Sequence, residues 1–181
     1  MTRRLLFPVL AAVLFLSTTA APARADITLT PFIGGLFNGS LPTSKPSYGV
    51  SLAAMGAGVF GGEFDFSWTP SFVDASSTHN AVTEANMTGN LIIGIPIGGT
   101  HGASIRPYLV GGGGLLRATE KKSDFVDRIR SNDFAWDFGG GVMGTFNSHV
   151  GLRGDIRYFH TNSASNEYKF WRGTGGLAFK F

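Results

Sequence analysis

The segment that decides the fold is the last strand-like stretch, Trp171-Arg172-Gly173-Thr174-Gly175-Gly176-Leu177-Ala178-Phe179-Lys180-Phe181. Its odd-numbered positions carry large apolar residues or glycine, and its even-numbered positions carry small or polar ones. Successive side chains of a strand point to opposite faces, so one face of this segment is apolar and the other is polar. This alternation is typical of a strand that borders lipid on one side and a polar barrel interior on the other.

The N-terminal residues predict an export signal. The basic start Met1–Arg4 precedes a short apolar run, 5–16, and the small-residue motif Ala23-Arg24-Ala25. These three features are typical of a secretory signal peptide. The apolar run is shorter than the roughly 20 residues that a membrane helix needs, although an uncleaved anchor is the alternative. We therefore expect a signal peptide at residues 1–25, cleaved after Ala25, and one barrel domain at residues 26–181.

The charge and the cysteine content of the chain limit the kinds of partner and the kind of fold that we expect. The chain has 15 Lys and Arg against 12 Asp and Glu, and Arg3, Arg4 and Arg24 belong to the predicted signal. The mature chain is therefore formally neutral, which gives no argument for nucleic acid as a partner. The chain has no cysteine, so an exported domain must be closed without disulfides. A barrel whose backbone groups all pair between strands meets that requirement.

The alternation of the last segment recurs along the chain, in segments 27–37, 48–54, 60–69, 87–95, 104–117, 134–142 and 150–158. It is less regular in 104–117, where Gly111 to Gly114 blur it, and in 27–37, which carries Pro31. The connections between them alternate between short turns, at 56–59, 98–102 and 147–148, and longer polar stretches, at 38–46, 70–84, 118–133 and 161–167. Short periplasmic turns and longer outer loops are typical of outer-membrane barrels. The sequence therefore predicts an all-β fold, an eight-stranded antiparallel closed transmembrane β-barrel. Outward aromatic residues should form a belt near its outer rim, at Tyr48, Trp68, Trp136, Tyr158 and Trp171.

Four segments carry a resemblance to a known family, 106–112, 139–142, 152–159 and 170–181. Across residues 26–181 the chain resembles the outer-membrane β-barrel superfamily of small OmpA- and OmpX-like proteins. The resemblance implies a location in the outer membrane of a Gram-negative bacterium, with membrane lipids and lipopolysaccharide as partners. It also implies that the barrel-assembly machinery reads the terminal aromatic residue, Phe181, as an assembly signal. It implies no activity, and we expect a monomer without a cofactor.

Charged residues on the predicted inward face form the first candidate site. Alternation directs both signs of charge into the barrel, at Glu63, Asp65, Arg106, Asp137, Arg153, Asp155, Arg157, Arg172 and Lys180. An eight-stranded barrel is only wide enough for its own side chains, and buried charges need partners. We therefore expect a charge network that plugs the lumen, with a narrow ion path or a catalytic pair as alternatives. A soluble lipocalin-like barrel would need an apolar interior, which this charged face opposes.

The second candidate site lies at the outer end of the segment before the last. Residues 158–164 faintly resemble the His-x-Ser-Asn signature of PagL-type lipid A deacylases, which are also eight-stranded barrels. That resemblance implies His160 as base, Ser163 as nucleophile and Glu167 as orienting acid. The second residue after His160 is Asn162 rather than serine, so we expect no enzyme activity, but a structural or surface-interaction role. The mixed-charge loop 120–130 is a further candidate contact surface for lipopolysaccharide phosphates or a host factor.

Overall fold

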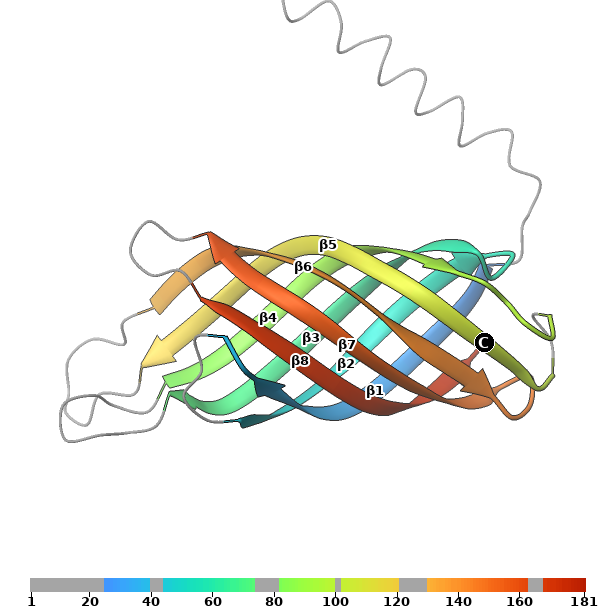
Figure 1. The fold of residues 1–181 in the computed structure, drawn as a ribbon, viewed down its shortest axis with the longest axis horizontal. Helices are drawn as coiled ribbons and strands as arrows, with labels where there is room; N and C mark the ends of the chain where they lie inside the picture. Colours follow the sequence, from blue (N-terminus) through green and yellow to red (C-terminus); the bar gives the residue numbers. More distant parts are fainter. Residues whose placement is uncertain (1–24, 40–43, 74–81, 100–101, 121–129, 163–167) are drawn as a thin grey trace, which may run out of the picture.

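A computed structural model gives the arrangement of the chain and describes residues 25–39, 44–73, 82–99, 102–120, 130–162 and 168–181. The strands in these ranges are β1 (Ala25–Phe37), β2 (Lys45–Gly56), β3 (Phe60–Val73), β4 (Val82–Gly94), β5 (Ser104–Glu120), β6 (Arg130–Thr145), β7 (Val150–Asn162) and β8 (Lys169–Lys180). Each strand pairs antiparallel with the next, and β8 pairs with β1, so the sheet closes into a barrel (Figure 1). The predicted fold class is confirmed. Within the described ranges, no helix is long and apolar enough to cross a membrane.

The two ends of the barrel differ in their connections. The strand ends beside the turns after β2, β4 and β6 lie at one end of the barrel, and the strand ends that the longer connections join lie at the other (Figure 1). Ala25 pairs with Gly56 at the short-turn end, and the backbone N–H of Phe181 donates there to Ile27 O at 2.9 Å. In the turn between β2 and β3, Ala57 has a φ of 49°, which places it in the left-handed region that alanine seldom adopts. The alternation of short and long connections is as the sequence predicts.

The strands reach further toward the long-connection end than the sequence predicts. β3 and β4 extend into the predicted loop 70–84, and β5 and β6 extend into the predicted loop 118–133, where Thr119 pairs with Arg130. These segments have polar residues on both faces, so the sequence predicts loops. Antiparallel strands that extend beyond the membrane into water can also have polar residues on both faces. Most of the predicted contact surface 120–130, at 121–129, lies outside the described residues.

The outward and inward faces of the strands are opposite in character. On β3, Phe64 is 48% exposed and the next residue, Asp65, is 1% exposed. A soluble sheet protein buries its apolar face, whereas a barrel in lipid exposes it and encloses the polar one. The residues of the predicted aromatic belt all lie on the outward face, at Tyr48, Trp68, Trp136, Tyr158 and Trp171.

Candidate functional site

The middle of the barrel interior holds buried ion pairs, named here the central charge layer and made of Glu63, Asp65, Asp137, Arg153, Asp155, Arg157 and Arg172. Arg157 on β7 reaches across the interior to β3, where its Nη1 lies 2.7 Å from Glu63 Oε1. Arg172 on β8 donates to both carboxylate oxygens of Asp65, at 2.8 and 2.9 Å. Two parallel bonds fix the plane of the guanidinium as well as its position. The layer therefore ties β7 and β8 to β3, which is not their neighbour in the sheet.

Tyr108 on β5 joins the central charge layer although it is aromatic. Its hydroxyl donates to Asp155 Oδ2 at 2.8 Å and accepts from Arg153 Nε at 2.7 Å. Arg153 Nη2 also lies 2.5 Å from Glu63 Oε2, and the Arg153 guanidinium carbon lies 4.7 Å from the centre of the Tyr108 ring. Sequence reasoning missed Tyr108 because the glycine run 111–114 blurs the alternation of this strand. The signal that could have found it is its spacing of two residues from the inward Arg106.

Asp137 on β6 is held less closely by the arginines. Its Oδ2 lies 3.7 Å from Arg157 Nη1. With its amide nitrogen turned toward this carboxylate, Asn90 donates to Asp137 Oδ1 at 2.9 Å and accepts from Arg157 Nη1 at 3.1 Å. This orientation satisfies both ends of the Asn90 amide. Asn90, which the sequence analysis did not single out, thus links β4 to the central charge layer.

Apolar side chains close the interior on both sides of the central charge layer. The outer apolar layer, toward the long connections, consists of Leu36, Leu116, Ala135, Phe159 and Phe170. The inner apolar layer, toward the short turns, consists of Met55, Ile92, Val110, Met143 and Ala178, together with the ring of Tyr108, whose hydroxyl reaches the central charge layer. Along β6 the buried residues run from Ala135 through Asp137 to Met143, so the charges lie between the two layers. The interior is therefore mixed, and not the uniformly polar lumen that the alternation suggested.

Aromatic rings of the outer apolar layer pack directly on the charges. The rings of Phe159 and Phe170 stack with their centres 5.2 Å apart. The Arg172 guanidinium carbon lies 4.8 Å from the centre of the Phe159 ring and 5.1 Å from that of Phe32. A guanidinium over an aromatic face is stabilised by the ring quadrupole. Arg172 is thus held by Asp65 at its edge and by rings on its faces.

A separate ion-pair cluster lies at the short-turn end. Asp26 Oδ2 lies 3.2 Å from Arg106 Nη2 and 3.0 Å from Lys180 Nζ. Arg106 and Lys180 are therefore paired apart from the central charge layer, with the inner apolar layer between them. Asp26 was missed because the first strand was predicted to begin at Ile27, whereas β1 begins at Ala25.

The outer end of the interior also carries charges that sequence reasoning missed. Glu84 on β4 and Lys45 on β2 are buried, although the sequence placed both in long connections. Their strands begin earlier than predicted, and this extension turns both residues inward. Among the described residues, no group of three or more His, Asp or Glu is placed to hold a metal ion.

His160, the predicted base of the deacylase alternative, lies on the outward side of β7. It pairs with Trp136 across the β6–β7 ladder, and the two ring centres are 5.1 Å apart. Ser163 and Glu167 lie outside the described residues. His160 thus belongs to the outer aromatic belt rather than to the barrel interior.

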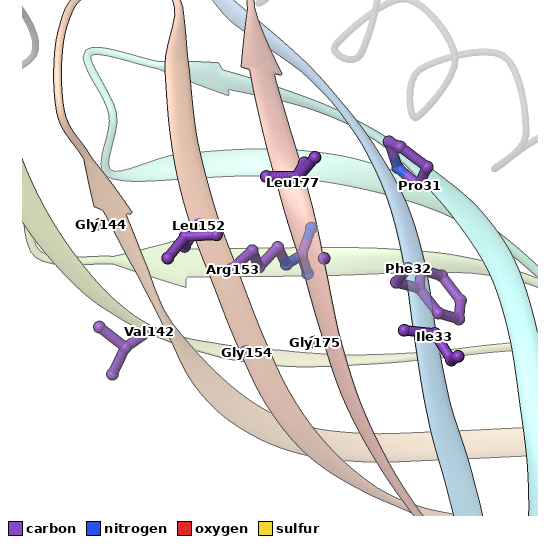
Figure 2. A pocket seen from close by; sticks show the side chains of 11 residues that line it. Pro31, Phe32, Ile33, Val142, Gly144, Leu152, Arg153, Gly154, Gly175 and Leu177 are labelled. Atoms are coloured by element: carbon purple, nitrogen blue, oxygen red, sulfur yellow. The ribbon is translucent and has the colours of Figure 1, made fainter.

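The lipid-facing wall has a hollow of about 770 Å³ over β6, β7, β8 and β1 (Figure 2). Three outward glycines line it, Gly144, Gly154 and Gly175, together with apolar side chains such as Leu152 and Leu177. A Cβ atom added at Gly144 or Gly175 would meet nothing within 4 Å. These glycines therefore leave open space on a surface that borders lipid, and do not serve a close approach between strands.

The closed sheet, the outward apolar faces and the aromatic belt define an integral β-barrel of the bacterial outer membrane. The chain belongs to the family described as outer membrane protein beta-barrel domain, which it matches over residues 9–181. The predicted resemblance is therefore confirmed. A search among curated proteins gave no match.

Solved structures share this fold. Neisserial surface protein A is similar with a TM-score of 0.67 and 14% identity, over 87% of this chain and 97% of that one. The N-terminal barrel domain of Pseudomonas aeruginosa OprF has a TM-score of 0.57 and 13% identity, over 87% and 100% of the two chains. OprG of Pseudomonas aeruginosa has a TM-score of 0.51 and 16% identity, over 87% and 96%. Identities this low show a common fold alone.

Proposed function

We propose that this protein is a non-catalytic outer-membrane barrel with a sealed interior, whose role is structural or lies in the surface it presents outside the cell. The observation that carries the proposal is the pair of cross-barrel contacts, Glu63 to Arg157 at 2.7 Å and Asp65 to Arg172 at 2.8 Å. They join β3 to the opposite wall, between two apolar layers. An ion crossing the barrel would have to break buried ion pairs and pass both apolar layers.

Conductance in a planar bilayer tests the sealed interior. The wild-type barrel should show no stable current steps, because its inward charges bind one another and not water. The double variant Arg153→Met with Asp155→Leu should stay silent too. It removes one positive and one negative charge, which lie 3.2 Å apart, and leaves Glu63 paired with Arg157, so the net charge of the layer is unchanged. Leu152→Val, on the lipid-facing side, is the matched control. A large cation-selective conductance in the wild type that the double variant alters would show that the charges line a pore.

Mass spectra of lipid A test the absence of catalysis. Cells that express the protein and cells that lack it should yield lipid A with the same acyl chains. The variants His160→Ala and Ser163→Ala should change nothing. Loss of an acyl chain that requires both His160 and Ser163 would establish the deacylase alternative and overturn the proposal.

We further propose that the barrel works as a monomer after removal of residues 1–25. Because β1 pairs with β8 along the described strands, the sheet closes without a second copy to cover an edge. Intact mass of the purified protein would measure the cleavage site, expected after Ala25, and light scattering in detergent would measure the number of copies. The role of Phe181 as an assembly signal stays a prediction from the resemblance.

A further inference from the structure

Aromatic rings gather on one side of the barrel at the outer rim. They form what is named here the rim patch, made of Trp136, Phe138, Tyr158, His160 and Trp171 on the outward faces of β6, β7 and β8. Neighbouring rings in the patch have their centres between 5.1 and 6.2 Å apart, so they form one continuous surface. On the opposite wall, Tyr48 and Trp68 make a smaller pair at 6.3 Å.

Basic residues flank the rim patch. Lys169 on β8 lies opposite His160 in the β7–β8 ladder. Arg117 lies on β5, the strand on the other side of β6, where it pairs with Asn132, four residues further out along β6 than Trp136. Among the strand residues whose side chains the structure describes, Arg117 and Lys169 are the Lys, Arg, Asp and Glu residues that face outward, and both are positive. The carboxylates of the described strands lie at inward positions. Within the described strands, the rings at the outer rim therefore have basic residues on both sides.

The position of the rim patch in the membrane suggests its ligand. Aromatic residues at a rim lie at the level of lipid headgroups, and cations there attract anionic headgroups. The end with long connections faces the outside in outer-membrane barrels, where the leaflet consists of lipopolysaccharide. We propose that the rim patch, together with Lys169 and Arg117, binds the phosphorylated sugar headgroup of lipopolysaccharide.

The chemistry of the headgroup fits the arrangement of the residues. Its lipid A part is a disaccharide with a phosphate at each end. The partly exposed rings of Trp136, Tyr158 and Trp171 suit the C–H groups of sugar rings. Lys169 and Arg117 suit the phosphates as charge-assisted donors. An anionic phospholipid has no sugar that would use the rings. A second copy of the chain would bring positive charge against positive charge. The site does not depend on a sealed interior, so the two proposals can fail separately.

Binding of purified lipid A to the folded barrel in detergent tests the inference. The ligands are lipid A with both phosphates, lipid A without phosphates, and phosphatidylglycerol. The variants are Lys169→Gln with Arg117→Gln, and Trp136→Leu. The matched control is Trp68→Leu, which removes a rim tryptophan from the opposite wall. Heat-dependent migration on a gel verifies that each variant is folded, and the charge variant retains every ring should Trp136→Leu fail to fold.

We expect both test variants to bind phosphorylated lipid A at least about tenfold more weakly than the wild type, and the control to stay within about twofold. Removing the phosphates should weaken binding to the wild type and abolish the difference between the wild type and the charge variant. Phosphatidylglycerol binding as tight as that of lipid A would overturn the inference, because any anionic lipid would then serve. Equal weakening by Trp68→Leu or no measurable binding would overturn it as well. A dimer in light scattering that Trp136→Leu converts to a monomer would also overturn it, because a second copy would then cover the patch.

Discussion

The two faces of β7 share one backbone but differ in what surrounds them. On the inward face, Arg157 lies 2.7 Å from Glu63 and 3.1 Å from Asp155. On the outward face, Leu152 and Ile156 are exposed and border lipid. Inward side chains meet fixed partners in a filled space, whereas lipid adapts to any apolar shape that it meets. Inward substitutions should therefore affect several residues at once, and outward substitutions should stay local.

The largest effect is expected from Arg157→Ala. The change leaves Glu63 and Asp155 with less positive charge in a buried site, so we expect a loss of about 3–5 kcal/mol in the free energy of unfolding. The outward neighbour offers a matched control, because Ile156→Ala removes apolar surface without removing an ion pair and should cost about 1 kcal/mol. Urea unfolding in lipid vesicles measures both variants. Equal losses would contradict the difference between the faces.

The next largest effect is expected from Leu152→Arg, which adds a charge to the outward face, whereas Arg157→Ala removes one from the inward face. It places an unpaired charge in lipid, which costs about 2–4 kcal/mol at the middle of the membrane and less toward either rim. Leu152→Ile keeps the residue apolar and should change the free energy of unfolding by less than about 0.5 kcal/mol. The same unfolding measurement compares the two. An arginine that costs no more than the isoleucine would show that this face does not border lipid.

The smallest effect is the expected difference in stability between alanine substitutions at two glycines on neighbouring strands. A Cβ atom at the inward-facing Gly141 would lie 2.6 Å from Tyr108 Oη and 2.3 Å from Gly154 O. At Gly154, which borders the lipid-facing hollow, the nearest atom would be Thr174 O at 3.7 Å. Gly141→Ala should therefore cost about 1–3 kcal/mol, and Gly154→Ala should stay within about 0.5 kcal/mol. Thermal unfolding of both variants in one detergent would show whether the order is reversed.

The strands and their faces could be predicted because apolar and polar residues alternate with a period of two residues, and this alternation indicates both where a strand lies and which of its side chains point inward. Once Phe64 is placed in lipid, Asp65 must point inward, and no other information is needed. The same rule placed Trp136 and Trp171 in the outer belt. It failed where strands continue through polar residues, as at Glu84, because a polar strand in water has no apolar alternation to mark it.

The order of charged and apolar layers along the barrel axis, and the partner of each inward charge, could not be predicted in the same way. The sequence suggested one network of inward charges, and the structure pairs Arg106 and Lys180 with Asp26 instead. Which inward residues meet depends on the tilt and stagger of the strands, which alternation does not carry. Phe159 and Tyr108 show the same limit, since their inward direction follows from spacing but their contact with Arg172 and Asp155 does not.

The contact between Asp65 and Arg172 has a consequence for the order of assembly. It joins residues 107 positions apart in the chain, on strands that come together only when the last strand meets the first. Before that step the β3 carboxylates have no guanidinium beside them, and an open sheet entering lipid would carry unpaired charges at a cost of several kcal/mol. Partly formed sheets should therefore stay out of the bilayer, so that insertion and closure occur together. Contacts of such long range also slow folding, and closure should set the rate at which the barrel appears.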